Sequence, residues 1–142
     1  MMNRNDPKVN KIVKRLLGNA KGRSKDPQKT RGKDDFTLTE DWVYEQMEKQ
    51  GYTCPYTGVP YDFGLGKSWH GRAGAPARAS INRLNPMQGY TPENCEVVSN
   101  WYNAMMGPYT HREVSDFVPG LFKSMARSGK IGLWYKLLSY IT

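Results

Sequence analysis

The sequence has few cysteines, no long apolar run and comparatively few acidic residues. Its 142 residues include only Cys54 and Cys95, so we expect no disulfide framework, and a zinc site built from four cysteines of one chain is excluded. No apolar run approaches the roughly 20 residues needed to cross a bilayer, so we expect no membrane association. The polar, basic N-terminal stretch also lacks the apolar segment of a secretory signal, which favours an intracellular protein.

What the sequence does contain suits a small globular protein. A hydrophobic content of 38% and an aromatic content of 12% are enough for a modest core and too high for a disordered chain. The length suits one domain, or one small domain with an arm, and it excludes the large α/β enzyme scaffolds.

The excess positive charge is concentrated near the N-terminus. Residues 1–35 carry 11 Lys and Arg against 4 Asp and Glu, whereas residues 36–142 carry 10 against 9. Because each phosphate that a protein neutralises releases counterions, this segregation favours DNA as the partner. The alternatives are a solvated helix and linker, or a basic RNA-binding protein, although no RNA-binding module is recognisable. The candidate nucleic-acid-binding residues are Lys11, Lys14, Arg15, Lys21, Arg23, Lys25, Arg31, Arg72 and Arg78.

Two helices are predicted in the first fifty residues. Asp6 and Pro7 suit the start of the first helix, in which apolar residues recur every three to four positions. Residues 21–35 show no periodicity and are predicted to form a loop. Thr39 suits the cap of a second helix that ends at Gly51, before a short strand, a tight turn and a return strand. We therefore expect a basic helix and linker over residues 1–35, attached to a core of residues 36–110.

Residues 79–106 are predicted to form a strand, a polar loop, a second strand and a helix. The strands cover residues 79–84 and 96–99, and the helix covers residues 100–106. Polar residues at the end of the first strand and on the helix are typical of a ββα-metal hairpin. Two ligands that converge from strand and helix can hold one divalent cation, which stabilises the charge on the leaving oxygen of a scissile phosphate. Such a site suits a hard cation, Mg²⁺ or Mn²⁺, and we expect no small-molecule cofactor.

Residues 111–142 are predicted to form a helical region outside this core. Thr110 and Glu113 form a capping-box pattern, and an apolar stripe over residues 114–122 follows, with a bend at Pro119-Gly120 as one option. The tail over residues 131–141 is apolar and aromatic, so it should be buried against the core or in a homodimer interface.

These blocks resemble the HNH (His-Me finger) endonucleases, in particular phage-type members. The matching residues, spread over roughly residues 12–106, are Ser80-Ile81-Asn82-Arg83-Leu84-Asn85, Gly89-Tyr90-Thr91, Asn94, Val97-Val98-Ser99 and Asn103, with Phe36-Thr37-Leu38-Thr39 and Cys54-Pro55-Tyr56-Thr57-Gly58-Val59-Pro60 upstream. The resemblance implies an α+β fold in which helices flank a small ββα-metal core. It also implies a metal-dependent DNA endonuclease, encoded by a phage and active in the cytoplasm of its host.

The resemblance assigns roles to four residues by position. Asn82 and Asn103 stand where the family carries its two metal ligands. Asn94 stands where the family's middle Asn ties the loop to the hairpin through backbone hydrogen bonds, and Arg83 occupies the position at which most members carry the general-base His.

Two of these positions depart from the family pattern. Asn82 offers a neutral carbonyl where most members have a carboxylate, so metal affinity should fall. Arg83 stays protonated and cannot act as a base, although it can clamp a phosphate. The group that activates water would then be His70, in an exposed loop over residues 64–78, or Tyr90, or a metal-bound hydroxide.

The cysteines are a further departure. Many HNH proteins carry a zinc knuckle made of two Cys pairs, but here the first pair has become Cys54 with Thr57. We therefore expect no structural zinc, and we expect Cys54 and Cys95 to be small core residues and not a bonded pair.

Two functions of different class remain open from the sequence. The first is a DNA endonuclease that nicks DNA or cuts branched DNA, as homing and junction-cutting enzymes do. The second is a catalytically inactive HNH-fold module that binds DNA or regulates another process. The loss of the usual Asp and His favours the second function, whereas the retained Asn94 and Asn103 favour the first.

Overall fold

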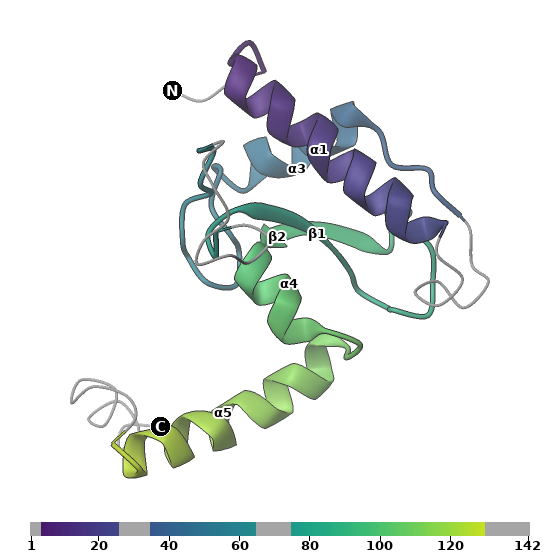
Figure 1. Ribbon diagram of the computed structural model, residues 1–142. Coiled ribbons are helices and arrows are strands. Elements are labelled where there is room, and N and C mark those ends of the chain that lie inside the picture. Colours follow the sequence, from purple (N-terminus) through teal and green to yellow (C-terminus); the bar gives the residue numbers. More distant parts are fainter. Residues whose placement is uncertain (1–3, 26–34, 65–74, 130–142) are drawn as a thin grey trace. The chain divides into compact units, whose positions relative to one another are not determined.

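The computed structural model of the protein describes residues 4–25, 35–64 and 75–129. These residues form α1 (Pro7–Ser24), α3 (Glu40–Lys49), β1 (Ala79–Arg83), β2 (Cys95–Ser99), α4 (Asn100–Met106) and α5 (His111–Arg127) (Figure 1). The predicted mixture of helices and a small antiparallel sheet is confirmed. The chain divides into two compact units, Met1–Pro108 and Tyr109–Thr142, which are described separately.

Helix α1 begins with the cap that its sequence predicts. The Asp6 side chain accepts a hydrogen bond from the backbone N–H of Lys8 at 2.8 Å, and Pro7 occupies the first turn. Val9, Ile12 and Val13 have no exposed surface, and α1 contacts both α3 and β1. We expected a basic arm outside the core over residues 1–35. Instead α1 is part of the core, because its apolar stripe has to be removed from water.

Helix α3 packs on β2 and also agrees with its predicted limits. The Thr39 side chain accepts a hydrogen bond from the backbone N–H of Trp42 at 3.1 Å, and Val43 and Met47 are fully buried. After α3, the predicted pair of short strands is reduced to a single bridge between Thr53 and Pro60.

The two strands form an antiparallel hairpin that carries the polar residues of interest. In its register Ala79 lies opposite Ser99, and Asn82 lies opposite Glu96. Helices α1 and α3 lie over one face of the sheet, and α4 follows β2 directly and lies on the other face (Figure 1). Successive side chains of a strand point to opposite faces of the sheet. The face of β1 that carries the Asn82 side chain is the one on which α4 lies.

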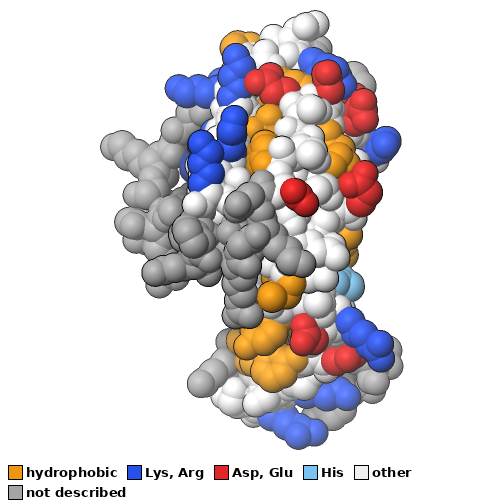
Figure 2. All heavy atoms as spheres, turned by 90° about the vertical axis from the view of Figure 1, so that its right-hand side faces the viewer, with side chains coloured by type: hydrophobic (Ala, Val, Ile, Leu, Met, Phe, Trp, Pro, Cys, Tyr) orange, Lys and Arg blue, Asp and Glu red, His pale blue; other side chains and the backbone are white. Residues whose placement is uncertain are grey.

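The second unit contains α5. Its predicted capping box is present, because the Thr110 hydroxyl accepts from the Glu113 backbone and the Glu113 carboxylate accepts from the Thr110 backbone. The helix continues through Pro119 and Gly120. Phe117 is 68% exposed and Leu121 43% exposed, so much of the predicted apolar stripe faces outward, and hydrophobic side chains are visible at the surface at the level of α5 (Figure 2). The tail over residues 131–141 lies outside the described residues, and the homodimer stays a prediction.

None of the helices in the described ranges is long and apolar enough to cross a lipid bilayer.

Candidate metal and nucleic-acid site

Asn82 and Asn103 lie in one pocket. Asn82 comes from β1 and Asn103 from α4, and both line a pocket of about 420 Å³ at the edge of the hairpin. The hairpin thus brings together the two residues that the resemblance assigns to the metal. The other described residues that line the pocket are Arg23, Ile81, Arg83, Pro86, Met87, Tyr90, Gly107 and Pro108.

Hydrogen bonds orient both amide side chains. Asn82 Nδ2 donates to Glu96 Oε1 at 2.9 Å, and Asn103 Nδ2 donates to Ser80 Oγ at 2.7 Å and to the Ile81 carbonyl at 3.2 Å. A carboxylate and a carbonyl oxygen can only accept, so each amide must present its nitrogen to these partners. The amide oxygens of Asn82 and Asn103 are therefore the atoms of these side chains that could serve as metal ligands.

Glu96 is a residue of the site that sequence reasoning missed. It pairs with Asn82 across the hairpin, and its second carboxylate oxygen accepts a hydrogen bond from the Tyr56 hydroxyl at 2.5 Å. Tyr56 stacks on Tyr102 of α4 with the ring centroids 4.3 Å apart. Burial, together with the hydrogen bond to Glu96, raises the pKa of Tyr56 above its usual value, so this phenol remains a donor. The antiparallel register, which places position 96 opposite position 82, is the signal that could have identified Glu96.

Asn94 ties down the loop that joins the strands. Its side chain accepts from the Asn85 backbone N–H at 2.9 Å and donates to the carbonyls of Asn85 at 3.1 Å and Gly89 at 2.8 Å. These are backbone hydrogen bonds of the kind that the resemblance implies. Asn94 is only 5% exposed and is not among the described residues of the pocket wall, so its hydrogen bonds serve to position the loop.

Arg83 and Tyr90 form one wall of the pocket. The Arg83 guanidinium lies 4.9 Å from the centre of the Tyr90 ring and donates to the Gln88 carbonyl at 3.1 Å. Tyr90 is almost fully buried, and its backbone bonds to Asp35 at 2.7 Å and to Thr37 at 3.0 Å. The ring is therefore a platform that holds Arg83 at the pocket, where the guanidinium can meet a phosphate.

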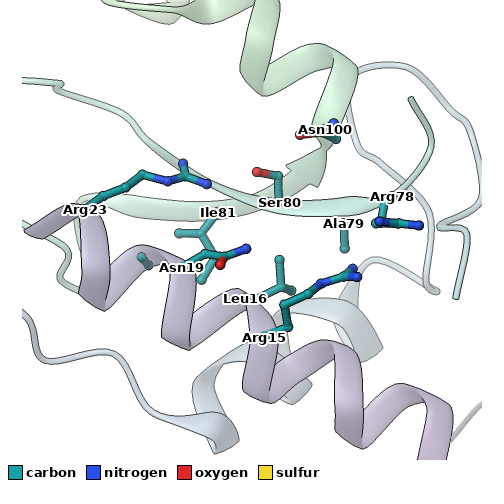
Figure 3. Close-up of a pocket in the computed structure, with 10 residues that line it drawn as sticks. Arg15, Leu16, Asn19, Arg23, Arg78, Ala79, Ser80, Ile81 and Asn100 are labelled. Atoms are coloured by element: carbon teal, nitrogen blue, oxygen red, sulfur yellow. The ribbon is translucent and has the colours of Figure 1, made fainter. Parts of the chain in front are cut away.

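The remaining candidate residues fall into three groups. Arg15, Arg23 and Arg78 line a second pocket between α1 and β1 (Figure 3). Lys11, Lys14, Lys21 and Lys25 are exposed on α1 or directly after it. His70, Arg31 and Arg72 lie outside the described residues.

The donor set of the Asn82–Asn103 pocket suits a weakly held hard cation. Within the described part of the chain, no group of three or more His, Cys, Asp and Glu side chains is gathered to hold a metal. The amide oxygens of Asn82 and Asn103 are hard but neutral ligands, of a type that Ca²⁺ and Mg²⁺ accept alongside water and phosphate oxygens. Arg23 and Arg83 line the same pocket and repel a cation, so the pocket fits a cation that arrives together with a phosphate.

Cys54 and Cys95 are buried free thiols, as predicted. Burial acts to raise the pKa of Cys54, but hydrogen bonds from Thr57 and Ser99 outweigh it and leave this pKa below its usual value. The backbone N–H of Ser99 donates to Cys54 Sγ at 3.2 Å, which links the residue 52–61 turn to the end of β2. Burial raises the pKa of Cys95 to about 12, as for an inert core thiol.

Comparison of the chain with protein-family models, with curated proteins and with solved structures found no match.

Proposed function

We propose that this protein is a DNA endonuclease of the HNH type that uses Mg²⁺ or Mn²⁺, with residues 79–106 as its ββα-metal hairpin. One observation carries the proposal: Asn82 on β1 and Asn103 on α4, whose amide nitrogens are held by hydrogen bonds, line one pocket together with Arg23 and Arg83. Amide oxygens suit a hard cation and guanidinium groups suit a phosphate, so the pocket offers ligands for the metal and for the phosphate of a metal-assisted hydrolysis.

Each residue then has a distinct task. Asn82 and Asn103 would hold the cation, which when bound stabilises negative charge on the leaving oxygen. Arg83, supported by the Tyr90 ring, and Arg23 would bind the non-bridging oxygens of the phosphate. Glu96 would keep the Asn82 amide turned with its oxygen toward the pocket. We propose His70 as the group that accepts the proton of the attacking water.

A second candidate function is a DNA-binding module that does not cleave. It is favoured by the composition of the pocket wall, in which the described residues include two arginines and no carboxylate or imidazole. In this case the same arginines would hold a phosphate without hydrolysing the ester, and the protein would act by occupying DNA.

Nicking of supercoiled plasmid in Mg²⁺ or Mn²⁺ tests the first function. We expect the protein to convert supercoiled to open-circular DNA, and we expect Asn103→Ala to lower the rate on the order of 100-fold, as loss of an oriented ligand does. Gln46→Ala on α3 is the matched control, because it removes an amide away from the pocket wall.

The result separates the two functions. If the protein binds DNA tightly but leaves plasmid and branched DNA uncut, and Asn82→Asp and the Asn82→Asp, Glu96→Gln pair also leave them uncut, the binding module is the function. If Asn103→Ala and Gln46→Ala cut as fast as the unmodified protein, the assigned site is wrong.

A further inference from the structure

The second pocket gathers three arginines on one short stretch of surface. It has a volume of about 310 Å³ and lies between α1 and β1. Arg15 and Arg23 belong to α1, and Arg78 directly precedes β1; all three line the pocket (Figure 3). Asn19, Ser80 and Asn100 supply neutral polar groups, and no acidic residue is among the described residues of its wall.

The residues on α1 form a regular row. Arg15, Asn19 and Arg23 are spaced four residues apart, so they lie along one face of the helix. At 1.5 Å per residue, Arg15 and Arg23 are separated by about 12 Å along the axis. One strand of B-DNA advances about 3.4 Å per phosphate, so this row matches the rise of roughly three to four nucleotides.

The electrostatics of the pocket favour an anion. Burial lowers the pKa of Arg15 from its usual value, and the nearby Arg78 guanidinium lowers it further. Two like charges this close together repel each other, and a phosphate placed between them relieves that repulsion. Arg15 is half-buried, so this repulsion is less screened by solvent than it would be between fully exposed groups.

We propose that this pocket binds phosphates of a DNA strand on one side of the phosphate held at Asn82 and Asn103. Arg23 lines both pockets, so the two sites are contiguous and one strand can occupy both. The strand runs along α1 from Arg15 and Arg78 to Arg23 and then reaches the candidate metal site. The choice of DNA rests on the proposed function, but anion binding in this pocket does not depend on cleavage.

The salt dependence of DNA binding tests the proposal. The affinity for a labelled duplex is measured from 50 to 300 mM salt for the full chain and for Arg15→Gln, Arg78→Gln and Lys49→Gln. Log affinity falls as log salt rises, and each phosphate contact contributes about 0.9 to the steepness of this fall. We therefore expect each arginine variant to make the slope shallower by about 1. Lys49→Gln removes the same charge from the last turn of α3, away from both pockets, and should leave the slope unchanged.

Conservative variants guard against loss of folding. Arg15→Lys and Arg78→Lys keep the positive charge, so they should keep most of the salt dependence. They should lose only several-fold in affinity, because a lysine ammonium cannot make the bidentate hydrogen bonds that a planar guanidinium makes to a phosphate. If both Gln variants keep their thermal unfolding midpoints and bind DNA with the slope of the unmodified protein, the proposal is wrong. If they lower the slope while the unmodified protein fails to nick any DNA, the phosphate pocket stands and only the endonuclease function fails.

A second measurement separates a DNA phosphate from a free anion. The side-chain Nε signals of arginine are followed by NMR during titration with inorganic phosphate and with a short duplex. We expect the duplex to shift the Arg15 and Arg78 signals at micromolar concentration and inorganic phosphate to shift them only at millimolar concentration. If inorganic phosphate shifts both signals at micromolar concentration and the duplex does not shift them, the assignment to DNA is overturned.

Discussion

Substitution of Asn82 by Asp is the most informative change to this hairpin. The family resemblance favours Asp at this position, yet Asn82 Nδ2 donates to Glu96 Oε1 at 2.9 Å. An Asp there would place two carboxylate oxygens in contact and remove the only donor between them. Two unit charges about 3 Å apart repel by about 5.5 kcal/mol at an effective dielectric constant of about 20. Rotation of the half-buried Glu96 relieves part of this, so we expect Asn82→Asp to lower the free energy of unfolding by ~2–4 kcal/mol at pH 8.

The pH dependence of this loss has a definite sign. At low pH the two carboxyl groups share one proton, which restores a hydrogen bond between them, so the loss is smallest near pH 5 and grows as the pH rises. A bound divalent cation also offsets the repulsion between the two carboxylates. Mg²⁺ should therefore raise the unfolding midpoint of the variant more than that of the unmodified protein. Thermal unfolding at pH 5 and pH 8, with and without 5 mM Mg²⁺, measures both effects.

A compensating change provides the control. Glu96→Gln combined with Asn82→Asp exchanges donor and acceptor, so the amide of residue 96 donates to the carboxylate of residue 82. We expect the pair to unfold within ~1 kcal/mol of the unmodified protein and to nick DNA faster, because a carboxylate then faces the pocket. If Asn82→Asp alone is as stable at pH 8 as the unmodified protein, and Glu96→Gln does not affect it, the contact between Asn82 and Glu96 is not made.

Three further predictions concern the hairpin loop, helix α1 and helix α5. A Cβ on Gly89 would lie 2.4 Å from the Asp35 carbonyl oxygen, so Gly89→Ala should force the residue 85–94 loop away from residues 35–37. We expect it to lower the free energy of unfolding, measured by chemical denaturation, by ~2–4 kcal/mol. Gly120→Ala, at an open helical position, is the control and should leave the free energy of unfolding unchanged or raise it. Deletion of residues 1–25 should abolish cooperative unfolding seen by circular dichroism, because it removes the fully buried Val9 and Ile12; a cooperative melt in the truncated chain would contradict the packing of α1. If the exposed apolar face of α5 forms a homodimer, Phe117→Ser should halve the mass seen by light scattering, and a monomeric unmodified protein would refute the predicted interface.

Local signals in the sequence predicted the elements around the site well. The caps at Asp6, Thr39 and Thr110 each depend on one side chain and the backbone a few residues away, so they can be read without knowing the fold. The hairpin and α4 also lie within one or two residues of their predicted limits, because alternation of apolar residues and a polar turn-rich loop determine them.

Long-range features could not be read in the same way. The excess of Lys and Arg over residues 1–35 predicted a basic arm, whereas burial of Val9 and Val13 makes α1 part of the core. The apolar residues that recur along the same segment indicate burial of one face, and the Lys and Arg residues lie largely on its other faces. Glu96 was not predicted as a site residue because its role depends on the hydrogen bond to its cross-strand partner Asn82, which its neighbours in sequence do not reveal. The meeting of Arg15 with Arg78 likewise depends on how α1 crosses β1.

In the proposed site, the amide oxygens of Asn82 and Asn103 hold a cation beside a DNA phosphate. Titration of Mn²⁺ into the ¹⁵N-labelled protein bound to a short duplex tests it most directly, because Mn²⁺ broadens NMR signals only from nearby nuclei. We predict that the side-chain amide signals of Asn82 and Asn103 broaden first, at Mn²⁺ concentrations that leave those of Asn5 and Gln46 sharp. If other signals broaden first while those of Asn82 and Asn103 stay sharp, the cation lies elsewhere and the assigned site is wrong.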